Sequence, residues 1–366
     1  MFDVAKAAVA PLTGIAAVAV GLLFGGAGPS CGAQESVRLP AGVRAVWDLA
    51  KAHRETTATR ERVCLNGLWR WQPAPSDAAA VPAANWGFFK VPGCWPGITD
   101  YLQKDFQTVH AHPRWQKTRL ADVTSAWYER EITADAAWAG RRIVLVAEYV
   151  NSYAAVYLDG RPVGEIRFPG GEVDLTARCR PGRKHRLSLL VVALPLRGVM
   201  LSFNDTNSAR QVKGRVARRG LCGDVHLVSM PAGARLAEVA VTTSVRKKEI
   251  RCQARLEGLV PDVSYRLHAR VAEGERTLRE FTGAAFTAGD LEEGRAALTH
   301  KWQPDELWDI HTPGHQYELS LSLLDARGKL LDAFHPTRFG FREFWIEGRD
   351  FFLNGTRLFL SAVPLD

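Results

Sequence analysis

The sequence lacks most of the short patterns that mark nucleotide, metal or redox chemistry. No two of its six cysteines form a Cys-x-x-Cys pair, which excludes zinc ribbons and thioredoxin-like redox sites. It has no phosphate-binding loop and no nucleophile elbow. Long amphipathic helical patterns are missing too, and no second apolar run follows the N-terminal one. These absences disfavour P-loop nucleotide hydrolases and helical membrane bundles.

The excess of positive charge is small and scattered. Lys and Arg number 47 against 39 Asp and Glu, which gives a net charge of +8. The densest basic stretches, residues 178–186 and 210–219, follow no helical stripe, so they are interpreted as solvated loops rather than a face for nucleic acid. With 46% apolar and 23% charged residues the composition is globular, and 366 residues allow two or three domains.

The N-terminus has the features of a secretory signal peptide. A basic residue precedes an apolar run over residues 7–27, and small residues lead to a cleavage site after Ala33, so residues 1–33 are expected to be removed on export. An uncleaved membrane anchor stays open, because about 20 apolar residues can span a bilayer. So does a lipoprotein acylated at Cys31, although Gly28 replaces the Leu usual in such signals. The expected location is periplasmic or extracellular, with membrane contact only through this segment.

Cysteines after this segment are odd in number, which leaves at least one thiol without a disulfide partner. They are Cys64, Cys94, Cys179, Cys222 and Cys252. Burial as small hydrophobic residues is favoured over one or two disulfides, and the spacing leaves both open.

From residue 140 onward, apolar and polar residues alternate with a period of two, the pattern of half-buried β-strands. The clearest runs are residues 142–148, 187–192, 239–245, 250–256, 265–271 and 317–323. Asp159-Gly160 marks a tight hairpin, because both residues accept positive φ. Short strands separated by turns, without long helices between them, predict a mainly β protein built of β-sandwiches.

The pattern also suggests domain boundaries. Residues 34–59 are expected to be a linker or N-terminal extension, and residues 60–231 a first sandwich. A boundary is predicted near residue 231, where one strand ends and a new alternating set begins. Residues 232–338 then have the size of one immunoglobulin-like sandwich, about 100 residues. Residues 339–366 are a third element that contains an Asn-Gly hairpin between apolar strands.

A series of short motifs follows one order along the chain. Residues 65–69 read Leu-x-Gly-x-Trp, residues 91–95 Val-Pro-x-x-Trp, and residues 127–130 Trp-Tyr-x-Arg. Further motifs lie at residues 159–164, 174–176, 220–225, 307–317, 339–342 and 352–355. Together they resemble glycoside hydrolase family 2, the family of β-galactosidases, β-glucuronidases and β-mannosidases. One departure is Gly223, where that family usually has Arg.

The resemblance implies a sugar-binding jelly-roll domain over residues 60–231, an immunoglobulin-like sandwich over residues 232–338, and the start of a catalytic (β/α)8 barrel. Such a barrel takes roughly 250 residues, so residues 339–366 would supply only its first hairpin and strand. Catalysis in the family is retaining and uses two glutamates at barrel strand ends, an acid/base and a nucleophile. Because neither position lies in the sequence, no catalytic residue is assigned and no turnover is expected from this chain alone.

Three residues are candidates for contact with a sugar. Residues 203–207 resemble a β-galactosidase loop in which an Asp helps to hold galactose and an ion. Asp205 would occupy that place beside Asn204, with an Asx-turn as the structural alternative. Trp95 lies in an apparent loop and would stack on a sugar ring, with core packing as the alternative.

Other polar groups are interpreted as structural. Glu129 and Glu131 lie two apart on an expected strand and are interpreted as a solvated pair or as sheet-edge charges. A Pro-Gly pair between His311 and His315 excludes the helix on which they could bind a metal ion. No metal site and no cofactor is expected.

The sequence therefore predicts the N-terminal portion of an exported, β-galactosidase-like family 2 glycoside hydrolase. Its partners would be a β-galactoside-like glycan and a separate or downstream catalytic barrel, and not nucleic acid. The alternatives are a stand-alone carbohydrate-binding or adhesion module and an inactive gene remnant. An uncovered apolar segment within residues 339–366 would favour aggregation or association.

Overall fold

The described part of the chain is built almost entirely of β-strands. A computed structural model describes residues 36–95, 108–194, 199–203, 209–213 and 218–361. Within them helical structure is confined to three 3-10 turns, η2 (Leu120–Asp122), η3 (Ala136–Trp138) and η4 (Ala288–Asp290). No helix among the described residues is long and apolar enough to cross a membrane. The mainly β fold class is confirmed.

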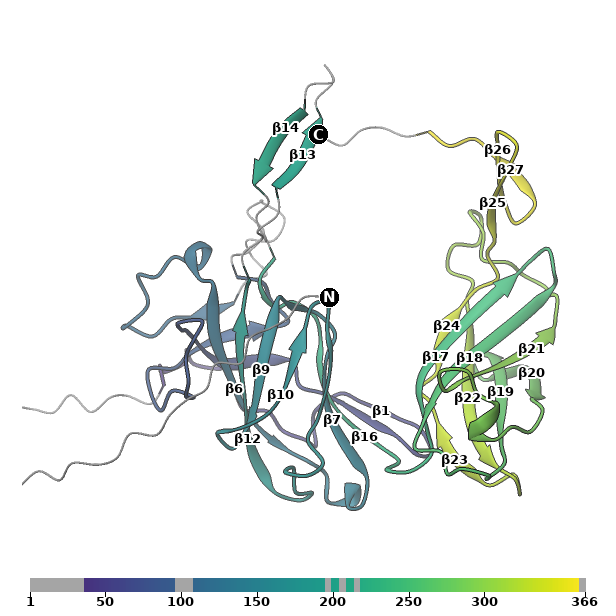
Figure 1. The fold of residues 1–366 in the computed structure, drawn as a ribbon. Coiled ribbons are helices and arrows are strands. Elements are labelled where there is room, and N and C mark those ends of the chain that lie inside the picture. The colour runs from purple at the N-terminus through teal and green to yellow at the C-terminus, as the bar shows by residue number, and fades with distance from the viewer. Residues whose placement is uncertain (1–35, 96–107, 195–198, 204–208, 214–217, 362–366) are drawn as a thin grey trace, which may run out of the picture.

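The first sandwich pairs a five-stranded sheet, in the order β1-β2-β16-β7-β11, with a seven-stranded sheet, in the order β10-β9-β12-β6-β3-β4-β5 (Figure 1). Their bounds are β1 (Arg54–Thr56), β2 (Glu61–Cys64), β3 (Gly67–Pro73), β4 (Gly87–Val91), β5 (Val109–His110), β6 (Ser125–Thr133), β7 (Arg142–Ala147), β9 (Tyr153–Leu158), β10 (Arg161–Arg167), β11 (Gly171–Asp174), β12 (Lys184–Val192) and β16 (Val225–Met230). Two smaller pairs join this sandwich, β8 (Val150–Asn151) with β15 (Gly220–Leu221), and β13 (Val199–Phe203) with β14 (Ala209–Lys213).

The second sandwich pairs a three-stranded sheet, in the order β17-β18-β21, with a sheet in the order β20-β19-β22-β23, to which β24 adds beside β22. Their bounds are β17 (Arg235–Ser244), β18 (Glu249–Glu257), β19 (Tyr265–Glu273), β20 (Arg276–Thr282), β21 (Arg295–Lys301), β22 (Tyr317–Asp325), β23 (Leu330–Ala333) and β24 (Thr337–Phe339). Among the described strands, none of this set pairs with a strand of the first sandwich.

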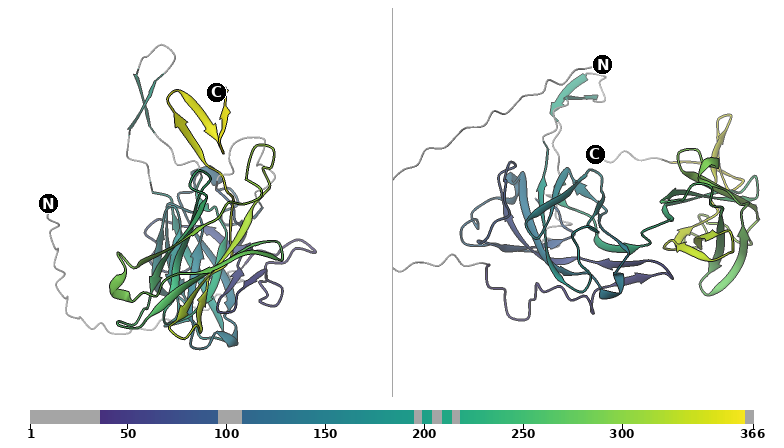
Figure 2. Two further views of the ribbon diagram at one scale, coloured as in Figure 1. Left: turned by 90° about the vertical axis from the view of Figure 1, so that its right-hand side faces the viewer. Right: turned by 60° about the horizontal axis from the view of Figure 1, so that its bottom comes forward.

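A separate three-stranded sheet follows, made of β25 (Phe344–Glu347), β26 (Asp350–Leu353) and β27 (Thr356–Leu358). The hairpin between β26 and β27 turns at Asn354 and Gly355, whose φ angles are +52° and +95°. The Asn354 side chain accepts a hydrogen bond from the Glu343 backbone N–H (2.9 Å) and donates to the Trp308 carbonyl (3.2 Å). The sheet is thereby fastened to the second sandwich, and it projects beyond it (Figures 1 and 2).

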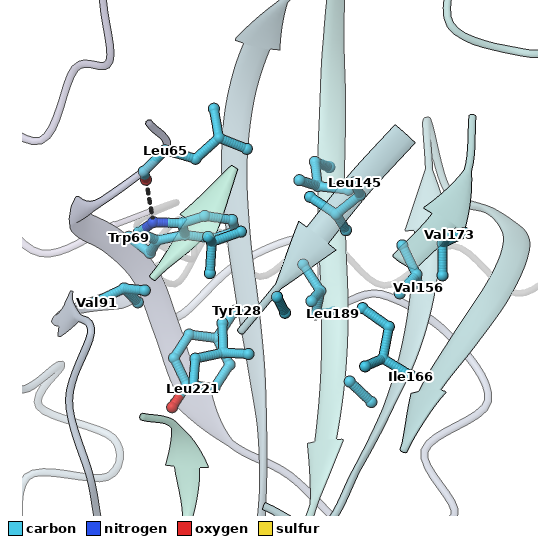
Figure 3. Close-up of a cluster of buried hydrophobic side chains, with 14 of the residues drawn as sticks. Leu65, Trp69, Val91, Tyr128, Leu145, Val156, Ile166, Val173, Leu189 and Leu221 are labelled. Carbon is cyan, nitrogen blue, oxygen red and sulfur yellow. Dashed lines mark hydrogen bonds between the residues drawn. The ribbon is translucent and has the colours of Figure 1, made fainter. Parts of the chain in front are cut away.

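The core of the first sandwich lies between its two sheets. Alternate residues of β3, β6, β9 and β12 face those of β2, β7 and β16, as the period of two requires. Figure 3 draws fourteen residues of this core as sticks and labels ten, among them Trp69, whose indole N–H donates to the Leu65 carbonyl (2.8 Å). The labelled set is Leu65, Trp69, Val91, Tyr128, Leu145, Val156, Ile166, Val173, Leu189 and Leu221.

One buried arginine closes the edge of this core. Arg130 donates to the carbonyls of Leu65, Asn66 (2.8 Å) and Leu68 (2.7 Å), and its guanidinium lies 5.1 Å from the ring centroid of Trp69. Because its side chain is only 6% exposed, burial lowers the Arg130 pKa to about 10. These hydrogen bonds join two of the sequence motifs, at residues 65–69 and 127–130.

A buried carboxylate joins the two sandwiches. Asp332 on β23 is fully buried and accepts hydrogen bonds from Arg60 Nε (2.9 Å), Thr59 Oγ1 (2.9 Å) and the Leu236 backbone N–H (2.8 Å). Arg60 belongs to the β1–β2 turn of the first sandwich, is 4% exposed, and also donates to the Leu236 carbonyl. Every oxygen of the buried carboxylate therefore has a partner, and the junction contains a paired charge rather than an isolated one.

We expect Arg130→Ala to lower the free energy of unfolding by about 3 kcal/mol or more, because it leaves buried carbonyl groups without donors. Urea denaturation of the purified protein measures this loss. Arg161→Ala, at an exposed position on β10, is the matched control and should change the free energy by less than about 0.5 kcal/mol. Equal losses in the two variants would contradict the structural role of Arg130.

Candidate functional site: a cleft on the outer face of the first sandwich

Of the three sugar-contact candidates of the sequence, only Trp95 lies among the described residues. Asn204 and Asp205 lie outside the described residues. Trp95 is fully buried, and its indole N–H donates to the Tyr128 hydroxyl. This placement favours the alternative of core packing for Trp95, since neither face of its ring is open to a ligand.

The motif around Trp95 depends on a glycine. Gly220 has φ of +114°, and a Cβ atom there would lie 2.5 Å from Trp95 Nε1 and 2.9 Å from the Tyr128 hydroxyl. Only glycine accepts both the positive φ and the close approach. Three motifs therefore meet around Trp95, at residues 91–95, 127–130 and 220–225. Their contacts with one another stabilise the fold.

A different polar cluster lies on the outer face of the seven-stranded sheet. Side chains alternate along β6, so Tyr128 faces the core while Glu129 and Glu131 face outward. Glu129 is directly opposite Arg70 on β3 and Ser188 on β12. The carboxylate accepts from Arg70 Nη1 (3.2 Å) and the Ser188 hydroxyl (3.2 Å).

The expectation of a solvated Glu129 is wrong. Its side chain is only 2% exposed, because the strand is central and its neighbours cover it. Burial raises the Glu129 pKa above the ordinary glutamate value, and the nearby Arg186 and Arg70 guanidinium groups offset only part of that effect. Glu131 is exposed as expected, and it pairs with Lys184 (2.7 Å).

Two adjoining clefts flank Glu129. One, of about 450 Å³, lies under the segment of residues 39–47, and the other, of about 550 Å³, lies beside residues 81–83. Three residues line both: Glu129, Glu131 and Arg186. The first cleft adds the rings of Trp47 and Phe88, and the second adds a His185–Asp159 pair (2.7 Å).

This lining has the composition of a site for a polar, hydroxylated ligand. Arg and carboxylate side chains donate to and accept from hydroxyl groups, and aromatic rings pack against apolar faces. Sequence reasoning missed Arg70, Arg186 and Ser188 because nothing along the chain relates them. The signal that could have found them is the strand register, which places all three around Glu129.

A second cluster has the residue types of a metal site, at Glu148, Asp224 and His226, whose ligand atoms lie within 4.8 Å of one another. The positively charged side chain of Arg62, however, already lies where a metal ion would bind. Arg62 Nη2 lies 2.5 Å from Glu148 Oε1 and 3.2 Å from His226 Nε2, and Asn66 donates to Asp224 (2.9 Å). Burial and Arg62 lower the His226 pKa to about 4.

The fold has solved counterparts, although no family model matches the sequence. A Lactobacillus rhamnosus β-glucuronidase superposes with a TM-score of 0.59 at 17% identity over 84% of this chain. A Bifidobacterium dentium β-glucuronidase complexed with coumarin-3-O-glucuronide gives 0.63 at 20% over 83%, and a Ruminococcus gnavus β-glucuronidase 0.60 at 18% over 84%. The chain has the fold of part of a β-glucuronidase. It covers 49%, 51% and 50% of those chains, about half of their length.

These counterparts confirm the mainly β architecture that the resemblance to glycoside hydrolase family 2 implied. They are β-glucuronidases, whereas the sequence reasoning favoured a β-galactosidase-like protein. Identities of 17–20% show the fold and leave the sugar to be proposed.

We expect the stability contributed by Glu129 to fall as pH rises. Because its pKa is raised in the folded protein, its contribution is fully present below the unfolded-state value and is lost as pH rises through the folded-state value. The difference in unfolding free energy between wild type and Glu129→Gln should therefore decrease upward from about pH 4. Urea denaturation across pH 4–8 measures it, and Glu131→Gln, at an exposed position, is the control. A difference that grows with pH would contradict the assignment.

Proposed function

We propose that this chain is the non-catalytic, N-terminal part of an exported family 2 β-glycosidase, and that its two sandwiches support a catalytic (β/α)8 barrel. Half-length coverage of β-glucuronidases and the ordered motifs of the sequence support this proposal. In such an enzyme the barrel supplies the acid/base and nucleophile carboxylates of a retaining hydrolysis. The residues of this chain would position the barrel and contribute no group to bond cleavage.

The observation that carries the proposal is the apolar surface of the last sheet. Four large apolar side chains on or beside β25–β27 are exposed: Phe344 (50%), Ile346 (62%), Phe359 (93%) and Leu360 (53%). A cluster of exposed apolar side chains on a small sheet marks a surface that another element covers. In the proposed enzyme that element is the barrel, whose first strand would follow β27.

The arrangement of the hairpins agrees with this role. The pair β13–β14 and the sheet β25–β27 both project from the same end of the molecule (Figures 1 and 2). They come from different sandwiches and are distant in sequence. A barrel at that end would contact both sandwiches, and residues 203–207 begin at the end of β13. Asp205 would then enter the sugar site from the first sandwich.

The sugar is proposed as a terminal β-glycoside. The resemblance around Asp205 favours a β-galactoside, and the solved counterparts are named β-glucuronidases. Export rests on the N-terminal segment, which lies outside the described residues.

Hydrolysis of nitrophenyl β-glucuronide, β-galactoside and β-mannoside tests the proposal. The 366-residue chain should give no turnover above a heat-treated control. Where the reading frame continues beyond codon 366, the longer product should contain barrel strands with two glutamates and should hydrolyse one of the three. Turnover by the 366-residue chain would contradict the proposal.

A second candidate function is carbohydrate binding without catalysis, and the clefts beside Glu129 favour it. A glycan array on the purified chain tests this candidate. Binding that is lost in Arg186→Ala and retained in Arg161→Ala would assign it to these clefts. Absence of binding on the array would remove the candidate.

We expect the double variant Ile346→Thr with Phe359→Ser to reduce self-association, because it removes two of the most exposed apolar side chains of the last sheet. Light scattering against protein concentration measures the change. Val260→Ser, at a 56% exposed position in the second sandwich, is the matched control. Truncation at residue 339 is unsuitable, since Phe341 is fully buried in the second core. Equal scattering by wild type and double variant would contradict the proposed surface.

A further inference from the structure

Two cysteines that are distant in sequence lie side by side in the first sandwich. The Gly93 backbone N–H donates to the Leu221 carbonyl (2.8 Å), and the Trp95 N–H donates to the Arg219 carbonyl (2.8 Å). These bonds pair the two segments in an antiparallel ladder. Cys94 lies between the two donors, and Cys222 directly follows Leu221.

The ladder places both thiols on the same side. Trp95 and Leu221 are fully buried in the core. Because neighbouring side chains of an extended segment point to opposite sides, Cys94 and Cys222 point away from the core, and each is half-buried. The two thiols are therefore neighbours on one side of the ladder, and each shifts the pKa of the other.

This environment makes Cys94 the nucleophile of the pair. The neighbouring Cys222 side chain, aided by the positive charge of Arg218, lowers the Cys94 pKa to about 7 despite partial burial. The same proximity, together with burial, raises the pKa of Cys222. Burial raises the pKa of Cys179 to about 11 and of Cys252 to about 12, so those two thiols stay protonated and unreactive.

We propose that Cys94 and Cys222 form a redox-active dithiol, which closes to a disulfide by exchange with a small external disulfide such as oxidised glutathione. The Cys94 thiolate attacks one sulfur of the external disulfide and expels a thiolate. The Cys222 sulfur then attacks Cys94 Sγ and expels the second. The two protein protons end on the two released thiols, so two protein thiols are oxidised and one external disulfide is reduced.

Closure would join the residue that follows β15 covalently to the segment that follows β4. The linked residues are distant in sequence, and a bridge across so long a loop restricts the unfolded chain strongly. The oxidised protein should therefore unfold at a higher temperature than the reduced protein. The inference stands on these two segments alone and does not depend on the proposed function.

Thiol mapping by peptide mass spectrometry tests the proposal. The full chain is reduced, desalted and exposed to oxidised glutathione at pH 7. A Cys94–Cys222 cross-linked peptide should appear, together with a rise in the unfolding temperature. In the reduced protein, iodoacetamide should modify Cys94 at least about tenfold faster than Cys64, the half-buried thiol that serves as internal reference.

Two variants separate the steps. In Cys222→Ser, Cys94 should keep a glutathionyl adduct, because the resolving sulfur is gone, whereas Cys64→Ser should form the cross-link as wild type does. A persistent Cys94 adduct without cross-link in wild type would overturn the proposal, as would equal alkylation rates at Cys94 and Cys64. If Cys222→Ser fails to fold, the wild-type peptide map decides the question alone.

Discussion

The relative placement of the two sandwiches depends on the buried carboxylate of Asp332. It lies on the second sandwich and receives the guanidinium of Arg60 from the first, together with the backbone N–H of Leu236 at the start of β17. Removing one member of such a buried pair leaves a charge without compensation, which typically costs 3–5 kcal/mol. The pair also restricts the orientation of one sandwich relative to the other, since a bidentate guanidinium accepts few alternative geometries. The position of β25–β27 relative to the first sandwich is fixed through this contact.

The motifs that resemble glycoside hydrolase family 2 are explained by packing and hydrogen bonding. Arg130 ties together the backbone of residues 65–68, and Gly220 leaves room for Trp95 and Tyr128. Such residues are restricted because the fold needs them, and they carry no chemistry of their own. Resemblance in these motifs is therefore informative about architecture and silent about the sugar. Glu129 and Cys94, whose pKa values are also altered, occupy the unspecified positions of two of these motifs.

Local patterns of the sequence predicted the strands and tight turns well. The alternation of apolar and polar residues predicted β7, β12, β18, β19 and β22. The Asp159-Gly160 turn has the positive φ values, +51° and +74°, that its residues allow. The burial of Glu129 could not be predicted, because it depends on neighbours contributed by other strands. The partnership of Arg60 with Asp332 spans 272 positions, and no periodicity relates them. The sequence leaves open whether Trp95, in an apparent loop, binds a sugar or packs in the core, since only the fold decides which surface covers its ring.

Calorimetric unfolding of wild type and Asp332→Ala tests most directly whether the buried pair makes the two sandwiches unfold as one cooperative unit. We expect a single cooperative transition in wild type. Asp332→Ala should show two separate transitions, because each sandwich keeps its own core and only the contact between them is lost. Asp305→Ala, at an exposed position in the second sandwich, should unfold as wild type does. Two transitions already in wild type, or an unchanged single transition in Asp332→Ala, would contradict this role of the buried pair.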